Sequence, residues 1–386
     1  MSKNLISNTR NLVLLLLGFT FPLSVALSNI LVVLLAVLIL VEENFFEKIQ
    51  KINSSKWMKS ILLLWVMYII YFFIFGSFTD TFWLIKRISL LLLLPIFYSS
   101  SFSEKTIQKS VFAFLISMFL SSVIAIVENY EIINLNPNLT ISAFLKYTDH
   151  NVFLAFSLII SFYSIFRIKL ENKYRNILLF FIPFYLFSLF TEGGKSGQLA
   201  FLFSVILFLI FLFKKKWKLL LLSLISVFVF SAIIYNTSDI VKNRFNYEAK
   251  NILQNRKSDR NILLKETIIL IKKNPIFGYG TGSFTDEFGL VNKETQKVVS
   301  NQHKTPHNNY LYVWFELGIL GLIIFLSIFY FQIKELIKKA EDIFIILFPI
   351  MFLIIMFTDS YLFSQNTLVL YLFLSIITIN YQYKPS

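Results

Sequence analysis

Long apolar stretches alternate with short polar segments along the 386 residues of the chain. A helix needs about 20 predominantly apolar residues to cross a membrane. The pattern therefore predicts an all-α fold, a polytopic membrane bundle of about 12 transmembrane helices. The predicted spans lie near 11–26, 28–41, 57–75, 83–99, 108–128, 150–166, 176–191, 196–213, 217–235, 308–333, 342–358 and 366–381.

The first two spans come from one apolar stretch, residues 11–41, which is too long for a single straight crossing. Pro22 and Asn29 interrupt it, so we divide it into a short helical hairpin. A single broken helix is the alternative. No small-residue cleavage site follows the stretch, which indicates a permanent helix and not a removable signal peptide.

One polar segment is much longer than the others, residues 236–307. Ser258 can cap a helix that begins near Asp259, runs to Lys273 and carries many apolar side chains. Asn274-Pro275 ends this helix, and a loop with Gly278, Gly280 and Gly282 follows. We expect the helix to pack on the membrane surface or against the bundle. The sequence shows no internal repeat, so we predict one membrane domain, 1–386, with this segment as an outer loop.

Composition narrows the classes of protein that fit. Hydrophobic residues make up 56% and charged residues 15%, whereas an ordinary globular domain is about 25% charged. The absence of Cys excludes disulfide scaffolds, thiolate zinc sites and cysteine nucleophiles. Only three histidines are present, His150, His303 and His307, which argues against a His-rich metal centre.

The net charge of +14 invites a nucleic-acid-binding interpretation, but the distribution of the charges argues against it. Basic residues stand in short clusters between apolar runs, which is how membrane proteins set their orientation. With the N-terminus in the cytoplasm, twenty Lys and Arg fall in cytoplasmic segments and four, Lys86, Arg87, Lys146 and Lys195, in short outer segments. The twenty are Lys3, Arg10, Lys48, Lys51, Lys56, Lys59, Lys105, Lys109, Arg167, Lys169, Lys173, Arg175, Lys214, Lys215, Lys216, Lys218, Lys334, Lys338, Lys339 and Lys384.

Four basic residues on the predicted outer side are candidates for anion binding. Lys86 and Arg87 end the fourth span, Lys195 stands in the turn 192–197 beside three glycines, and Arg260 opens the loop helix. Snorkelling to lipid phosphates is the alternative for Lys86 and Arg87. Lys and Arg side chains that converge on one pocket would suit a pyrophosphate.

A second candidate region begins at Lys304-Thr305-Pro306-His307 and enters a span that contains Glu316, Gly318 and Gly321. A single histidine is more often structural than catalytic, so His307 alone decides nothing. Glu316 lies about two turns into the span, where an acid is costly unless it is paired or hydrated. It could anchor a neighbouring helix.

Taken together, these motifs resemble the O-antigen ligase family of bacterial envelope glycosyltransferases, which includes O-antigen polymerases. The resemblance rests on Arg260 with its helix, Asn274-Pro275-Ile276-Phe277-Gly278-Tyr279-Gly280, His307-Asn308-Asn309-Tyr310-Leu311 and Glu316-Leu317-Gly318. It covers about 190–325 by motif. Two positions depart from the family pattern: Lys195 stands where the family usually has Arg, and Leu264 where it often has Trp.

The resemblance implies a C-type glycosyltransferase-like fold and an inverting transfer that needs neither metal nor cofactor. The donor would be a glycan on undecaprenyl pyrophosphate at the periplasmic face. The acceptor would be a hydroxyl of lipid A–core oligosaccharide, or another lipid-linked glycan in a polymerase. His307 would be the general base, and Lys195, Arg260, Arg87 and Lys86 would bind the pyrophosphate. Gly278, Gly280, Asn308, Tyr310 and Glu316 would support the site.

Several alternatives stay open on the sequence. A polymerase of O-antigen or capsule polysaccharide carries the same motifs, and a protein O-glycan transferase is a further option. A transporter or flippase would have ionisable residues near mid-membrane and related halves, which are not evident here. We expect a multi-pass protein of the bacterial inner membrane with both termini in the cytoplasm. Its partners would be membrane lipids and lipid-linked glycans, and not nucleic acid.

Overall fold

The structure is a computed structural model. It describes residues 3–42, 44–129, 141–168, 170–213, 216–219, 259–295, 303–339 and 343–380, together with positions 221, 222, 225, 229, 236, 242 and 246. The chain forms two compact units, the first comprising Met1–Ser117 and Asp259–Pro385 and the second Met118–Ser258. Each unit is described by itself.

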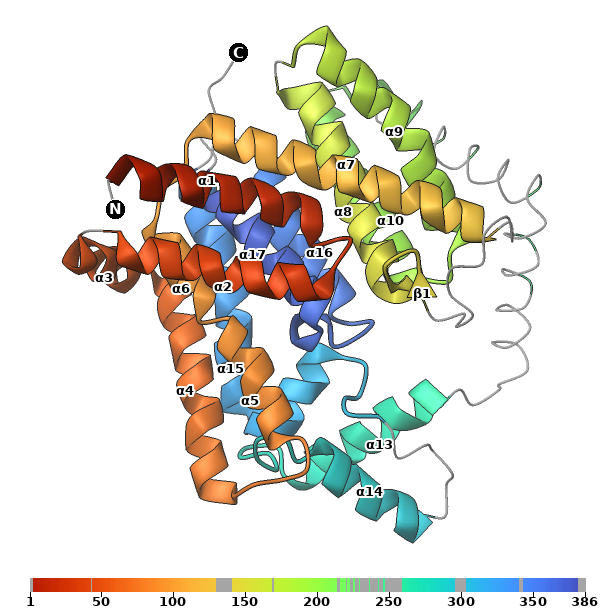
Figure 1. The fold of residues 1–386 in the computed structure, drawn as a ribbon. Coiled ribbons are helices and arrows are strands. Elements are labelled where there is room, and N and C mark those ends of the chain that lie inside the picture. Colours follow the sequence, from red (N-terminus) through yellow and green to blue (C-terminus); the bar gives the residue numbers. More distant parts are fainter. Residues whose placement is uncertain are drawn as a thin grey trace. The chain divides into compact units, whose positions relative to one another are not determined.

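Helices build almost all of the first unit (Figure 1). In chain order they are α1 (Lys3–Thr20), α2 (Val25–Val41), α3 (Phe45–Ser54), α4 (Lys56–Phe75), α5 (Thr81–Leu90), α6 (Leu93–Ser99), the start of α7 (Glu104–Asn129), α13 (Asp259–Lys273), α14 (Phe284–Thr295), α15 (Asn309–Lys339), the 3₁₀ turn η1 (Ile343–Ile346), α16 (Leu347–Ile355), η2 (Tyr361–Phe363) and α17 (Gln365–Asn380). The long helices α4 and α15 pack side by side, and α17 is buried along nearly its whole length.

The second unit holds the end of α7 and three long helices. These are α8 (Tyr147–Arg167), α9 (Asn172–Thr191) and α10 (Lys195–Phe213), and α8 packs against both of the others. Among the described residues the only strands are β1 (Ile141–Ser142) and β2 (Leu145–Lys146), which form a short antiparallel pair before α8. Apart from that pair, the all-α prediction is confirmed.

Residues 11–41 form two helices, α1 and α2, that pack against each other. Pro22 lies in the turn between them, and the Ser24 side chain caps α2 by accepting a hydrogen bond from the Leu27 N–H. This confirms the helical hairpin and rules out the single broken helix. Arg10 of α1 forms an ion pair with Glu42 at the end of α2, with a 2.6 Å N–O distance.

Seven predicted spans coincide with described helices that are long and apolar enough to cross a membrane. These helices are Lys56–Phe75, Thr81–Ser99, Glu104–Asn129, Tyr147–Arg167, Asn172–Thr191, Lys195–Phe213 and Asn309–Lys338. The second of them combines α5 and α6. The protein is therefore a multi-pass membrane protein.

The predicted number of twelve spans is not confirmed. Helix α16 has nine residues, about 14 Å at 1.5 Å per residue, so the predicted span 342–358 is not one continuous crossing helix. Helix α17 has sixteen residues and lies mostly inside the protein. Most of the predicted span 217–235 falls outside the described residues.

The predicted loop segment 236–307 contains two helices, α13 and α14. The bounds of α13, Asp259–Lys273, match the sequence prediction, although its expected cap Ser258 lies outside the described residues. Leu263, Leu270 and Ile271 are buried, and α13 packs against α14 and α15. The helix therefore docks on the protein through its apolar side chains, one of the two placements expected.

Candidate functional site

The loop after α13 docks on a break in the membrane helix α15. Gly318 has φ +66° and ψ −168°, which is not helical, so the regular hydrogen bonding of α15 is interrupted there. The Ile319 N–H donates instead to the Pro275 carbonyl, and the Phe315 and Glu316 carbonyls accept from the N–H groups of Tyr279 and Gly280, both at 2.9 Å. The loop thus satisfies the backbone groups that the break leaves open.

Close packing explains the glycines of this loop. A Cβ atom on Gly318 would lie 1.9 Å from the Ile276 carbonyl oxygen, and one on Gly278 would lie 2.6 Å from the Gly318 nitrogen. Gly278 and Gly280 also have positive φ angles, +71° and +105°, which suit glycine. Both predicted supporting glycines therefore shape the loop.

Glu316 also serves the loop. Its side chain is fully buried and accepts a 3.0 Å hydrogen bond from the Gly282 N–H. The ring of Tyr279 stacks on Phe315 at 4.7 Å, and its hydroxyl donates to the Leu270 carbonyl at 2.8 Å. Burial raises the pKa of Tyr279, so the hydroxyl keeps the proton that it donates. Glu316 thus anchors the loop, whereas the sequence suggested that it could anchor a neighbouring helix.

The predicted His-Asn motif forms the start of α15. The Asn308 carboxamide oxygen accepts from the N–H groups of Tyr310 and Leu311, at 2.9 and 3.0 Å, which caps the helix. The Asn308 side chain also donates to the Phe357 carbonyl, and the Tyr310 hydroxyl donates to the Leu353 carbonyl at 2.6 Å. Both supporting residues thus tie α15 to the segment that ends α16.

His307 lies immediately before that cap, in the left-handed region with φ +53°. Its Nδ1 atom is 2.9 Å from Oδ1 of Asp359, and its Nε2 atom is 3.3 Å from Nδ1 of His303. A carboxylate only accepts hydrogen bonds, so Nδ1 carries a proton toward Asp359. The His307 side chain is 29% exposed, so molecules outside the protein can reach it.

Arg260 joins the two backbone segments that carry this pair. Its Nη2 atom donates to the Thr358 carbonyl and lies 3.4 Å from the His307 carbonyl oxygen. Within the described part of the chain, Nη2 is its only nitrogen with a hydrogen-bond partner. The guanidinium is exposed and has further N–H donors available to an anion. Arg260 therefore lies beside His307, as the sequence predicts for a shared site.

A second cationic group lies in the same unit, at Trp83 of α5. The Arg87 guanidinium and the Lys304 ammonium lie 5.8 and 5.5 Å from the centroid of the indole ring. Lys304 also forms a 2.7 Å ion pair with the buried Asp80, and Arg87 donates to the Gln365 side chain. Lys304, three residues before His307, thus links Arg87 to the histidine segment, whereas Lys86 is exposed on α5.

Lys195 begins α10 in the second unit, so the structure gives no geometry between it and Arg260 or His307. The glycines beside it pack against α8. Cβ atoms on Gly194 and Gly197 would lie 2.3 Å from the Asn151 Cβ and 2.1 Å from the Asn151 carbonyl oxygen. The sequence suggested that these glycines allow an anion to approach the backbone closely, but in the structure it is helix α8 that approaches them. Anion binding by Lys195 stays a prediction.

A buried polar network includes Glu192, the first residue of that turn, and the sequence did not reveal it. Nδ1 of His150 lies 2.8 Å from a Glu192 carboxylate oxygen, and Nε2 lies 2.9 Å from the Ser121 hydroxyl. The Ser188 hydroxyl also donates to Glu192. His150 and Ser121 are completely buried, so this network fixes helices α7, α8 and α9 to each other inside the second unit and is closed to substrate.

Comparison with known proteins places these motifs in a family. Residues 177–326 match the family model described as O-Antigen ligase. The O-antigen ligase of Salmonella typhimurium is 27% identical to this chain over 245 residues, 60% of the chain. An uncharacterized protein of Haemophilus influenzae is 29% identical over 189 residues, 43% of the chain. The chain spans about half the length of these curated relatives, 56% and 46% respectively.

The O-antigen ligase segment contains most of the candidate site. Arg260, the glycine loop, His307 and Glu316 all lie within it. Asp359 lies beyond it, 52 residues after His307, and no local motif marks it. The sequence therefore identified the histidine but missed the carboxylate that orients it and the Lys304–Asp80 ion pair.

Proposed function

We propose that the protein is an inverting glycosyltransferase of the O-antigen ligase type. It would transfer a glycan from undecaprenyl pyrophosphate to a hydroxyl of lipid A–core oligosaccharide at the periplasmic face of the bacterial inner membrane. Both termini would lie in the cytoplasm. The match of residues 177–326 to the O-antigen ligase family model, and the similarity to the O-antigen ligase of Salmonella typhimurium, support the reaction class.

His307 acts as the general base in this proposal. With Nδ1 protonated toward Asp359, the imidazole lone pair is at Nε2, 3.3 Å from Nδ1 of His303. The acceptor hydroxyl would replace His303 as the partner of Nε2, which then takes the hydroxyl proton. The acceptor oxygen then forms a bond to the anomeric carbon as the bond to the pyrophosphate oxygen breaks, and the pyrophosphate leaves with the electron pair. Asp359 stabilises the imidazolium that results.

Cationic side chains balance the charge of the leaving pyrophosphate. Arg260 stands beside His307 with an exposed guanidinium, while Arg87 and Lys304 both lie near the ring of Trp83. We assign pyrophosphate binding to Arg260, Lys195 and Arg87, and a peripheral contribution to Lys86. Positive charge placed at the leaving group lowers the barrier, and the loss of one such contact raises it by roughly 2–4 kcal/mol. The proposal requires no metal ion.

The observation that carries the proposal is the contact between His307 and Asp359, 2.9 Å apart, in a partly exposed place at the start of α15. If His307 only capped the helix, it would not need the contacts that it makes with His303 and Asp359. A base needs both an oriented ring and access for the acceptor, and this arrangement offers both.

The test is glycan transfer in vitro by purified wild-type protein and by His307→Ala. The variant should lose about 10²–10⁴ in rate while it still inserts into membranes and binds lipid-linked donor. His303→Ala is the matched control and should be much milder. Transfer by His307→Ala at nearly the wild-type rate would leave His307 a structural cap.

Deletion of the gene distinguishes a ligase from a polymerase of the same family. Loss of a ligase should leave long glycan on the lipid carrier. Loss of a polymerase should leave single repeats that still reach the acceptor. Identification of the glycan's carrier in the deletion strain therefore decides the acceptor class.

A further inference from the structure

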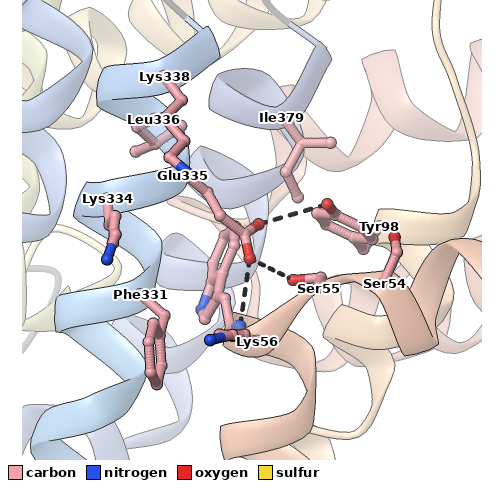
Figure 2. Close-up of a pocket in the computed structure, with 11 residues that line it drawn as sticks. Ser54, Ser55, Lys56, Tyr98, Phe331, Lys334, Glu335, Leu336, Lys338 and Ile379 are labelled. Atoms are coloured by element: carbon pink, nitrogen blue, oxygen red, sulfur yellow. Dashed lines mark hydrogen bonds between the residues drawn. The ribbon is translucent and has the colours of Figure 1, made fainter.

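A cavity of about 450 Å³ lies far from the His307 site, at the other end of α15 (Figure 2). From the break at Gly318 to residue 334 the helix rises about 24 Å, so most of the length of α15 separates the cavity from the His307 site. The cavity is formed by the end of α15, the start of α4, α6 and the end of α17. Its lining residues are Ser54, Ser55, Lys56, Trp57, Tyr98, Phe331, Lys334, Glu335, Leu336, Lys338 and Ile379.

Three lysines supply the charge of this cavity, Lys56, Lys334 and Lys338. In the part of the chain that the structure describes, none of their ammonium groups forms an ion pair. The Lys56 and Lys334 ammonium groups lie instead 5.8 and 5.6 Å from the ring centroids of Phe331 and Tyr330. The positive charge is thus available to an anion from outside.

Glu335 is the one acid in the lining, and other donors occupy it. Figure 2 shows its carboxylate at the centre of the site, joined to residues on the facing helices. It accepts hydrogen bonds from the Ser55 hydroxyl at 2.7 Å, the Trp57 N–H at 3.3 Å and the Tyr98 hydroxyl at 3.3 Å. Three lysines and one carboxylate leave two positive charges in excess.

The remaining walls are apolar, and the neighbouring helix has the features of an interfacial one. Trp57, Phe331 and Ile379 line the cavity beside the lysines. Helix α3, whose last residue Ser54 also lines it, has no buried residue, and its Phe46 is 88% exposed. A helix that exposes both aromatic and basic side chains is suited to the headgroup layer of a membrane.

We propose that this cavity binds the phosphate headgroup of an anionic phospholipid in the leaflet that faces the predicted cytoplasmic side. The phosphate would lie among the three ammonium groups, and the first part of the acyl chains would lie against Phe331 and Ile379. A soluble phosphate ester offers the same anionic chemistry without the apolar part. The apolar walls and the exposed aromatic residues of α3 favour the lipid.

The test uses the full-length protein in a neutral detergent, titrated with short-chain phosphatidylglycerol while its thermal unfolding is measured. Phosphatidylglycerol should raise Tm saturably, and phosphatidylcholine of the same chain length should not. Lys56→Gln, Lys334→Gln and Lys338→Gln together should weaken the apparent affinity by about tenfold or more. Lys338→Gln alone should weaken the apparent affinity several-fold. Because Lys338 is exposed, this single variant tests the site even if the triple variant is unstable.

A matched triple variant controls for general surface charge. Lys59→Gln, Lys105→Gln and Lys109→Gln remove three exposed lysines from the same predicted membrane side but outside the cavity, and should leave the affinity unchanged. Equal losses in both triple variants, or an equal response to phosphatidylcholine, would overturn the proposal. Competition by glycerol 3-phosphate at similar concentrations would identify a soluble anion and would overturn the assignment to a lipid.

Discussion

Asp359 orients His307 from the segment that follows α16, through its 2.9 Å contact with Nδ1. We predict that Asp359→Asn lowers the rate of glycan transfer by about 10²–10⁴ because the amide neither fixes the tautomer of the ring nor stabilises its cationic form. The measurement is single-turnover transfer by the purified variant. Asp286→Asn, which removes a carboxylate bonded to Thr79 on the same unit, is the control and should react at the wild-type rate. A wild-type rate for Asp359→Asn as well would show that Asp359 has no role in the reaction.

Arg260 and Lys195 can be separated by substitution, although they lie in different units. Lys195→Arg should keep activity, since it restores the residue usual in the family, whereas Lys195→Ala and Arg260→Ala should each lose roughly 2–4 kcal/mol of transition-state stabilisation. Transfer rates with excess donor measure this loss. Lys265→Ala, exposed on the same helix as Arg260, controls for general charge. Full activity of Arg260→Ala would contradict the proposed anion site, and a requirement for added divalent metal would contradict the charge balance.

His150 should matter for stability. His150→Ala leaves the Glu192 carboxylate buried without its imidazole partner, and breaking a buried pair in this way costs about 3–5 kcal/mol. Thermal unfolding in detergent should therefore show a marked fall in Tm. Glu171→Gln, at an exposed carboxylate before α9, should leave Tm unchanged. A wild-type Tm for His150→Ala would mean that the network contributes little.

The residues of the site differ in how well the sequence predicts them. Arg260 and His307 stand in motifs that can be recognised locally, and the structure places them side by side. Asp359 and Lys304 are ordinary acidic and basic residues in sequence. Their roles arise only when α16 and α5 meet the start of α15, and contacts of that range leave no periodic pattern in a single chain.

At the level of elements, the break in α15 gives a sharp test of the loop. Gly318→Ala would place a Cβ atom 1.9 Å from the Ile276 carbonyl at a positive φ angle, so the loop must move or the helix must straighten. We predict a destabilisation of about 1–3 kcal/mol or more, measured by thermal unfolding, with loss of transfer activity. Gly289→Ala is the matched control, because nothing outside the helix's own backbone lies within 4 Å of the new Cβ and alanine favours the helix. A stable, active Gly318→Ala would show that the break is dispensable.

Apolar runs predict where the apolar helices lie, but not which of them are long enough to cross the membrane. Helices α4, α8 and α9 coincide with their predicted spans because each is one uninterrupted run of suitable length. Helix α17 also matches its predicted span, 366–381, to within one residue, but its sixteen residues are fewer than a membrane crossing needs and most of them are buried by protein. Hydropathy alone does not distinguish a protein environment from lipid. Helix α14, with Asp286 and Glu287 in its first turn, has no long apolar run to predict it.

For the whole molecule, the predicted topology places α14 outside and Lys105 inside. The chain contains no cysteine, so each single Cys variant reports on one position. Leu290→Cys, at a position that is 54% exposed, should react with an impermeant thiol reagent in intact cells. Lys105→Cys should react only after the membrane is opened, because the clusters of basic residues put it in the cytoplasm. Labelling of Lys105→Cys but not of Leu290→Cys in intact cells would show that the predicted membrane topology is inverted.

The division into two units was not visible in the sequence. Both units consist of apolar helices joined by short polar segments, and no Pro- or Gly-rich linker marks residues 117–118 or 258–259. The boundary at 117–118 even lies inside the continuous helix α7. Residues 177–326 extend over parts of both units, so the family segment does not mark a unit either.

The break at Gly318 also has a consequence for the order of events during synthesis. Residues 275–280 leave the ribosome before residues 315–319, to which they bind. Open backbone groups are costly in hydrocarbon, so we expect α15 to enter the membrane as a straight helix. Helix α15 would bend at Gly318 only when residues 275–280 form the hydrogen bonds that replace those of the straight helix. Docking of the loop would then follow the insertion of α15, and a chain arrested before that step would have α15 in the membrane but no completed site.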